Sequence, residues 1–217
     1  MENKFLEMTP ELYRYMVEHG ARQDELLRRV ERETAELGDI AIMQIAPDEG
    51  ALLHLLVRAA SARFAVEVGT FTGYSAICIG RALQPGGRLL CCEISEDWAE
   101  IARRNLAEAR LDEVAEVRVA PALDTLRSLP AEEEVDFAFV DADKPGYADY
   151  YEELLLRMRP GALMVLDNVL LSGRVLLEDG DESSRAMRAL NRRIASDERV
   201  DCAMIGVADG LTIVRKR

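Results

Sequence analysis

The sequence has no excess of positive charge. It contains 27 Lys and Arg against 40 Asp and Glu, which gives a net charge of −13 over 217 residues. Proteins that bind nucleic acid through a broad basic face need the opposite balance, so this class is disfavoured. The balance does not exclude a local basic patch.

Metal-binding cysteine motifs, secretion signals and long apolar runs are also missing. None of the four cysteines has metal-ligand spacing, and Cys78, Cys91 and Cys92 lie in apolar segments, where we expect reduced, buried thiols. The N-terminal sequence MENKFLEMTPELYRY contains no apolar signal region, and no run approaches the length of a membrane span. We therefore expect a soluble protein in the cytoplasm.

Hydrolase signatures are absent as well. The chain has no G-x-S-x-G motif and no paired Cys and His. His19 and His54 fall on predicted helices without an acidic or nucleophilic partner, so we expect surface or hydrogen-bonded structural residues. With no internal repeat and no linker, residues 1–217 are expected to form one domain.

The patterning predicts an α/β fold preceded by helices. Segments 11–18, 24–37 and 48–60 are predicted helices, with Asp48 as the cap of the third. Residues 1–60 would form a helical cap, lid or dimer arm, and residues 61–217 a doubly wound core. The core strands are predicted at 64–68, 88–93, 115–119, 135–140, 162–166, 200–206 and 210–215. Helices are predicted at 74–83, 97–109, 122–128, 147–158 and 182–196.

Turn signals define the order of the last strands. Arg159-Pro160-Gly161 predicts a turn before the fifth strand, and Asp209-Gly210 predicts a hairpin between the last two. The expected sheet is therefore mostly parallel, with one antiparallel strand near the end and helices on both faces.

Acidic residues follow two buried strands at the point where each strand ends. The strand 135–140 runs into Asp141-Ala142-Asp143-Lys144, and another strand ends at Asp167-Asn168. Ligands of open α/β sheets bind outside the carboxyl ends of the strands. An alternative is that Asp141 or Asp143 only caps the next helix.

The first strand ends in a glycine turn with an unusual charge. Gly69 and Gly73 permit a tight turn and a close approach, but their spacing differs from dinucleotide and phosphate loops. Glu67 at this turn disfavours a pyrophosphate and suits a cationic ligand, such as a sulfonium or an amino group. Glu93 ends the second strand, where an acid can accept both hydroxyls of a ribose. A purely structural glycine turn is the alternative.

These motifs together resemble a known family. The segments are EVGTFTGYS at 67–75, CEIS at 92–95, APALDTL at 120–126, FVDADK at 139–144 and LDNVLLSGRV at 166–175. The chain resembles class I S-adenosylmethionine-dependent methyltransferases. More narrowly, it is similar over residues 44–210 to the cation-dependent O-methyltransferases that act on caffeoyl-CoA and catechols. The family fold is a seven-stranded sheet with a reversed last hairpin.

The resemblance implies roles for individual residues. A cofactor site would include Ile45, Glu67, Gly69, Thr70, Ser75, Glu93, Ala122, Asp141 and Asp143. A metal would be held by Asp141, Asp167 and Asn168, with Lys144 as the candidate base. Such an all-oxygen set suits a hard cation, Mg²⁺ before Ca²⁺ or Mn²⁺. An alternative for Lys144 is a salt bridge to Asp141 or Asp143. The resemblance also implies a homodimer.

The acceptor is less well defined. Plant members that act on coenzyme A esters have an asparagine where this chain has Ser172, so small catechols or other vicinal diols are the leading expectation. We expect the acceptor wall to come from the N-terminal helices, Tyr147 and residues 170–178.

Three other functions remain open. One is methylation of a hydroxylated uridine in tRNA, with a phosphate-binding patch from Arg159, Arg174, Arg185, Arg188, Arg192 and Arg193. Another is a non-catalytic module that binds S-adenosylmethionine for regulation. An oxidoreductase is the third, and the glycine spacing disfavours it.

Overall fold

The computed structural model describes residues 6–130 and 134–217. Its strands form one seven-stranded sheet in the order β3-β2-β1-β4-β5-β7-β6. The strands are β1 Phe64–Val68, β2 Arg88–Glu93, β3 Ala115–Val119, β4 Val135–Val140, β5 Met158–Leu166, β6 Val200–Ile205 and β7 Leu211–Lys216. Neighbours from β3 to β5 pair in parallel, while β7 runs antiparallel to both β5 and β6. The predicted single reversed strand is thus confirmed.

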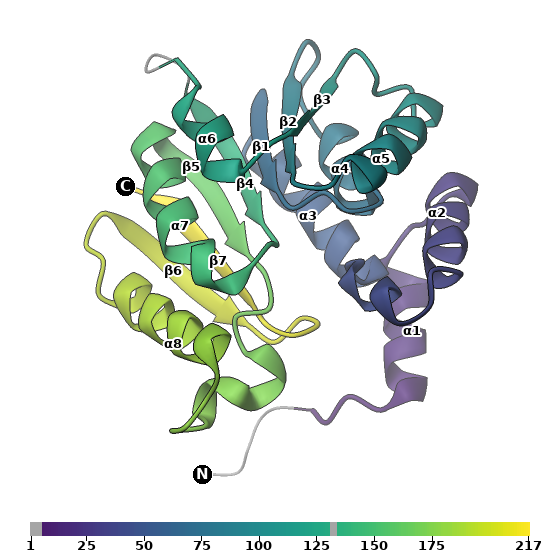
Figure 1. Ribbon diagram of the computed structural model, residues 1–217. Helices are drawn as coiled ribbons and strands as arrows, with labels where there is room; N and C mark the ends of the chain where they lie inside the picture. Colours follow the sequence, from purple (N-terminus) through teal and green to yellow (C-terminus); the bar gives the residue numbers. More distant parts are fainter. Residues whose placement is uncertain (1–5, 131–133) are drawn as a thin grey trace.

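Helices cover both faces of this sheet (Figure 1). They are α1 Pro10–Gly20, α2 Glu25–Ala35, η1 Gly38–Met43, α3 Pro47–Ala59, α4 Tyr74–Gly80, α5 Glu96–Glu108, α6 Ala122–Arg127, η2 Lys144–Gly146, α7 Tyr147–Arg157, η3 Leu171–Leu176 and α8 Glu182–Ala195. Alternate residues of β1 face opposite cores, as the strand period requires. Val66 belongs to the cluster that contains residues of α6, α7 and α8, whereas Ala65 belongs to the cluster that contains residues of α2, α3, α4 and α5.

Two predicted local features are wrong. The N-cap of α3 is Ala46, not Asp48, because Pro47 suits the first helical position and places Asp48 in the first turn. The predicted turn at 159–161 lies inside β5. A register shift against β4 and a positive φ of 84° at Gly161 accommodate the Pro-Gly pair without ending the strand.

The N-terminal helices are docked onto the core. In α2, Leu27 and Val30 belong to the buried cluster, and Asp24 at its N-terminus pairs with Arg81 at 2.9 Å. The buried hydroxyl of Thr34 lies 2.9 Å from that of Thr72 in the glycine turn. Because of this bond, α2 supports the same turn that the sequence assigns to the cofactor.

Residues 38–59 form a segment that is long and apolar enough to cross a membrane, judged by length and composition alone. The structure divides this segment. The chain is extended at Gln44 and Ala46, between η1 and α3, and Pro47 starts a new helix. A lipid-exposed break of this kind leaves backbone groups without partners, so we interpret the segment as two separate elements of the fold.

Candidate functional site

The candidate site lies at the carboxyl ends of four adjacent strands, β2, β1, β4 and β5. Backbone hydrogen bonds continue the ladder past each strand end. The amide of Gly69 donates to Cys92 at 2.9 Å, and that of Asp141 donates to Val68 at 2.8 Å. The amide of Asp167 likewise donates to Val140 at 3.0 Å. The sheet itself therefore fixes the positions of the site residues.

A cavity of about 1060 Å³ opens at this edge. Nearly all the residues proposed from sequence line it: Ile45, Gly69, Thr70, Ser75, Glu93, Ala122, Asp141, Asp143, Lys144, Asp167 and Asn168. Drug-sized ligands occupy cavities of roughly 300 to 1,000 Å³. The space therefore suits a nucleoside cofactor together with a small acceptor.

Gly69 explains how closely the first turn approaches β4. Its φ is +90°, and a Cβ at this position would lie 1.9 Å from the backbone oxygen of Asp141. No other residue type fits, so the glycine is required by both conformation and space.

Glu67 is the exception among the predicted residues, because it lies beneath the cavity instead of lining it. The side chain is fully buried, and neither carboxylate oxygen has a hydrogen-bond partner. Burial raises its pKa to about 8, although the nearby Ser75, Thr70 and Cys91 side chains lower it. These neighbours influence the carboxylate without meeting hydrogen-bond geometry. An unpartnered buried carboxylate favours a cationic ligand nearby.

Glu93 uses its carboxylate to organise the backbone. Oε2 accepts from the amides of Thr70 and Phe71 at 3.2 and 2.9 Å. Oε1 accepts from the amides of Ile94 and Ser95 at 2.7 and 2.9 Å. A carboxylate has about four acceptor sites, so a ribose hydroxyl would have to replace or share these bonds. The structure thus shows a turn-organising role for Glu93, and its ribose-binding role stays a prediction.

Lys144 bridges the ends of β4 and β5, where the sequence predicts the metal ligands. Its Nζ donates to Asp141 Oδ1 at 3.2 Å, to Asn168 Oδ1 at 2.7 Å and to the Tyr147 hydroxyl at 2.7 Å. The salt bridge to Asp141, one of the alternatives for Lys144, is therefore present. The same contacts show that a single cationic centre reaches oxygens from both β4 and β5.

The carboxylates around Lys144 repel one another. Burial, opposed by Lys144, raises the pKa of Asp141. Burial and then Asp141 raise that of Asp167 to about 7. Within residues 6–130 and 134–217, no group of three or more His, Cys, Asp or Glu side chains is arranged to hold a metal ion by itself. The predicted set is of another kind, because it combines two carboxylates with the amide of Asn168.

Asp143 is a helix cap, as one alternative proposed. Its Oδ2 accepts from the Gly146 amide at 3.0 Å, and its Oδ1 accepts from the Tyr150 hydroxyl at 2.7 Å. It also lines the cavity, so capping and ligand binding are compatible.

The expected acceptor wall needs correction. Tyr147 does not line the cavity; it is buried, and its hydroxyl donates to the backbone oxygens of Val140 and Asp167, both at 3.1 Å. The aromatic side chain at the cavity is Tyr150, one helical turn later. The helices α1 and α2 contribute no lining residue. Residues 170–178 do line the cavity as expected, through Leu171, Ser172 and Arg174, and the other lining residues include Met43 of η1 and Glu49 of α3.

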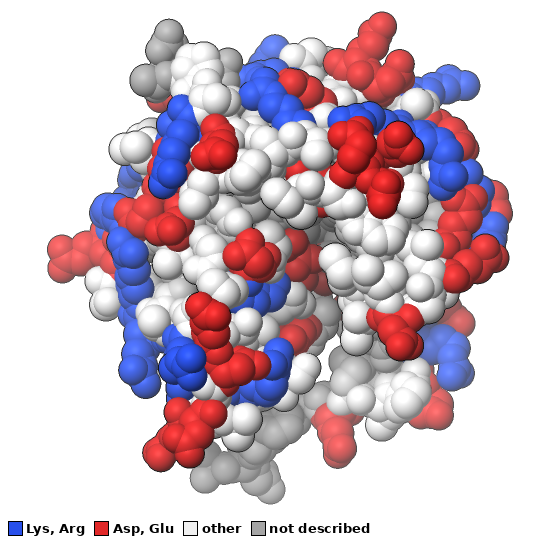
Figure 2. Space-filling view, in the orientation of Figure 1, with Lys and Arg blue, Asp and Glu red and all other residues white. Residues whose placement is uncertain are grey.

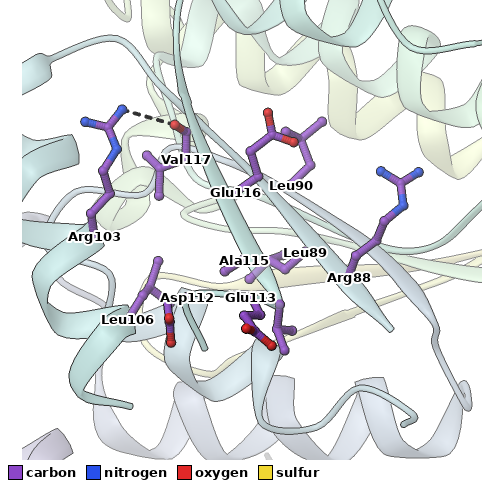
Figure 3. Close-up of a pocket in the computed structure, with 11 residues that line it drawn as sticks. Arg88, Leu89, Leu90, Arg103, Leu106, Asp112, Glu113, Ala115, Glu116 and Val117 are labelled. Carbon is purple, nitrogen blue, oxygen red and sulfur yellow. Dashed lines mark hydrogen bonds between the residues drawn. The ribbon is translucent and has the colours of Figure 1, made fainter. Parts of the chain in front are cut away.

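A second cavity, of about 510 Å³, lies near the amino-terminal halves of β2 and β3 (Figure 3). Arg103 donates to the backbone oxygen of Val117 at 3.1 Å there. It thereby satisfies an acceptor of an edge strand. This cavity lies away from the carboxyl ends of the strands, and we assign the function to the larger one.

Both histidines behave as expected. Nδ1 of His19 lies 2.8 Å from the Tyr15 backbone oxygen, and the exposed ring stacks on Tyr15. Nδ1 of His54 lies 3.2 Å from the Cys78 backbone oxygen. The four cysteines are free, and Cys78, Cys91 and Cys92 are buried.

Strand order, reversed β7 and the ligand-facing turn after β1 define a class I methyltransferase fold. Residues 17–217 match the family model described as O-methyltransferase. The chain belongs to this O-methyltransferase family and is a methyltransferase dependent on S-adenosylmethionine.

Curated relatives support the same placement. The chain is 36% identical to tricin synthase 1 of Oryza sativa subsp. japonica, over 99% of the chain and 91% of that protein. It is 33% identical to caffeoyl-CoA O-methyltransferase 2 of Zea mays, over 99% and 86%.

Among solved structures, the chain is similar to the O-methyltransferase TomG of Streptomyces achromogenes in complex with S-adenosylmethionine. The TM-score is 0.88 at 34% identity, covering 95% of the chain and 96% of TomG. An O-methyltransferase of Bacillus cereus in complex with S-adenosylhomocysteine gives 0.87 at 32% identity, covering 94% and 96%.

Proposed function

We propose that this O-methyltransferase requires a divalent cation and methylates a hydroxyl of a small catechol or other phenolic vicinal diol. The observation that carries the proposal is the convergence of Asp141, Asn168 and Lys144 at the rim of the cofactor cavity. Groups from two neighbouring strands meet there around one cationic centre.

The cofactor would lie across the strand ends, with its nucleoside toward Glu93 and its methionine end toward Ser75 and Asp143. Ile45, Gly69, Thr70, Ala122 and Asp141 would complete the site. The buried, unpartnered carboxylate of Glu67 supports a ligand that carries positive charge. The absent side chain at Gly69 lets the turn come close to β4.

The residues also fit a hard divalent cation. Asp141, Asp167 and Asn168 would hold it through oxygen atoms, with Mg²⁺ preferred over Ca²⁺ or Mn²⁺. When bound, such an ion lowers the pKa of a phenolic hydroxyl, which is ordinarily about 10. Lys144 is placed beside these oxygens and would take the hydroxyl proton. The Tyr147 hydroxyl fixes the position of its Nζ.

The mouth of the cavity supports a compact aromatic acceptor. Ile42 and Met43 are exposed apolar side chains that line this cavity, as do Leu171 and Ser172. The homologues named for caffeoyl-CoA point to phenolic acceptors, and Ser172 favours one without coenzyme A. We further propose that residues 1–217 act as a single domain, that the cap 1–60 contributes to a homodimer, and that the protein is cytoplasmic.

The tRNA alternative has less support. Five of its six arginines already bond within the chain: Arg159 to Asp136, Arg174 to Asp181, Arg193 to Glu152, Arg185 to the backbone of Gly180 and Arg188 to that of Leu177. On the face shown in Figure 2, Lys and Arg gather along the left edge, and Asp and Glu lie beside them. The non-catalytic alternative is weakened because Lys144 and its oxygen partners are all present.

A methyl-acceptor screen with labelled cofactor tests the proposal. Catechols, acyl-CoA esters and undermodified tRNA are compared, and we expect transfer to catechols. Asp141→Ala should abolish transfer while weakening cofactor binding less. Transfer to tRNA alone, or full activity of the variant, would contradict the proposal.

A further inference from the structure

Glu49 is a buried acid outside the predicted cofactor and metal residues. It lies in the first turn of α3, is only 1% exposed, and its Oε1 atom is enclosed without a hydrogen-bond partner. Acids are favoured in a first helical turn because they lie near the positive end of the helix dipole. They normally stay exposed there, or they bond back to the cap in a capping box. The cap of α3 is Ala46, which has no side-chain oxygen to complete such a box.

The side chain faces the functional cavity instead. Glu49 is among the residues that line it, together with Asp141 and Asp167. Three carboxylates thus line one cavity, and Lys144 pairs with one of them, Asp141, at 3.2 Å.

Contacts with α4 and α1 fix the start of α3, which carries Glu49. A Cβ on Gly50 would lie 2.9 Å from the Tyr74 ring, so α3 and α4 are in close contact at this point. Asp48 accepts a hydrogen bond of 2.9 Å from the Tyr13 hydroxyl, which joins α1 to the start of the same helix. The neighbouring acid thus faces outward while Glu49 faces the cavity.

The acids that line the cavity outnumber the cation beside them. When ionised, Glu49, Asp141 and Asp167 carry three negative charges, and Lys144 offsets one of them. The remaining two would be matched by a divalent cation. Buried charges that lack a counter-ion are strongly unfavourable, so the cluster favours such an ion.

We propose that Glu49 is a positioning residue of the cation site, which accepts a hydrogen bond from a water molecule or hydroxyl group held there and does not touch the ion. Direct contact is not supported, since within the described ranges no three acidic, His or Cys side chains are placed to hold a metal. The inference rests on the cation dependence proposed above. It assigns Glu49 to cation affinity and leaves cofactor affinity to other residues.

Mn²⁺ binding, followed by the electron paramagnetic resonance of the free ion, tests this role without an activity assay. Removing a group that orients a metal site typically weakens affinity about 10- to 100-fold. We expect Glu49→Gln to weaken Mn²⁺ binding about 10-fold, with unchanged affinity for S-adenosylhomocysteine by calorimetry. Glu49→Asp, which keeps the charge, should retain more affinity than Glu49→Gln.

Asp48→Asn is the matched control, because it removes a carboxylate one residue away that points outside the cavity and can still accept from Tyr13. Its Mn²⁺ affinity should equal that of the wild type. Thermal melts establish that each variant folds. Equal Mn²⁺ affinity in Glu49→Gln and wild type would overturn the role of Glu49 and leave the cation dependence standing. A parallel loss of affinity for S-adenosylhomocysteine would have the same meaning. A wild type that binds no Mn²⁺ would overturn the cation dependence itself.

Discussion

Glu67 makes the unliganded protein less stable as the pH rises. The folded-state pKa is about 8, against an ordinary value of 4.5, because the carboxylate is fully buried. Between these values the unfolded chain releases the proton while the folded chain keeps it. The unfolded state therefore binds fewer protons, and the free energy of unfolding falls across this window. The effect is absent below pH 4.5 and complete above pH 8.

The size of the effect follows from the displacement of the pKa. Each pH unit in the window contributes about 1.4 kcal/mol, which gives roughly 3 kcal/mol at pH 7 and about 5 kcal/mol above pH 8. Glu67→Gln keeps the shape of the side chain and removes the titration. It should stabilise the protein at pH 7 by up to about 3 kcal/mol, which corresponds to a rise in Tm of roughly 6 to 12 °C for a chain of this size.

Thermal and denaturant unfolding from pH 5 to 8.5, without cofactor, measures this difference. The gap between Glu67→Gln and wild type should widen as the pH rises. Glu100→Gln, which neutralises an exposed acid on α5, should show no widening gap. The same Glu67 variant should bind S-adenosylmethionine more weakly, with a smaller loss for S-adenosylhomocysteine, which lacks the sulfonium charge. A gap independent of pH would refute the assignment of a buried, uncompensated acid.

Three further substitutions test the site. Gly69→Ala should lower the free energy of unfolding by about 3 kcal/mol or more, because backbone strain and a backbone clash add. Gly173→Ala, with a similar positive φ but open space around it, should lower it by about 1 kcal/mol. Chemical denaturation compares the two variants, and equal losses would contradict the packing argument. Tyr147→Phe should lower kcat, because Lys144 loses the hydrogen bond that positions its Nζ. It should also lower the free energy of unfolding by about 1 to 2 kcal/mol. An unchanged kcat would show that Tyr147 does not position Lys144 for catalysis. Thr34→Val should weaken cofactor binding by about 1 kcal/mol in calorimetry, because the Thr34 hydroxyl supports the glycine turn. Unchanged affinity would show that α2 does not influence the cofactor site.

The strand ends were predictable because their signals are local. A buried run that meets acids and a glycine marks the end of a strand, and parallel strands bring such ends to one edge. Asp141 and Asp167 therefore meet in the structure as the sequence indicates. The reversed β7 followed from the Asp209-Gly210 turn signal.

Side chains whose direction depends on docking were not predictable. Tyr147 and Tyr150 look alike in sequence and are both buried, and only the packing of α7 against the sheet decides that Tyr150 lines the cavity and Tyr147 does not. Glu49 looks like an ordinary first-turn acid, since the contact of Gly50 with Tyr74 that turns it inward is tertiary. Two of the four backbone bonds of Glu93, those from Thr70 and Phe71, depend on the turn conformation at Phe71, which has a positive φ of 48°.

We propose that Asp141, Asp167 and Asn168 make methyl transfer depend on a divalent cation. The decisive assay follows transfer of labelled methyl from S-adenosylmethionine to a catechol, first with EDTA and then with excess Mg²⁺. We expect EDTA to abolish transfer and Mg²⁺ to restore it in the wild type but not in Asp167→Ala. Transfer that continues at the full rate in EDTA would contradict it.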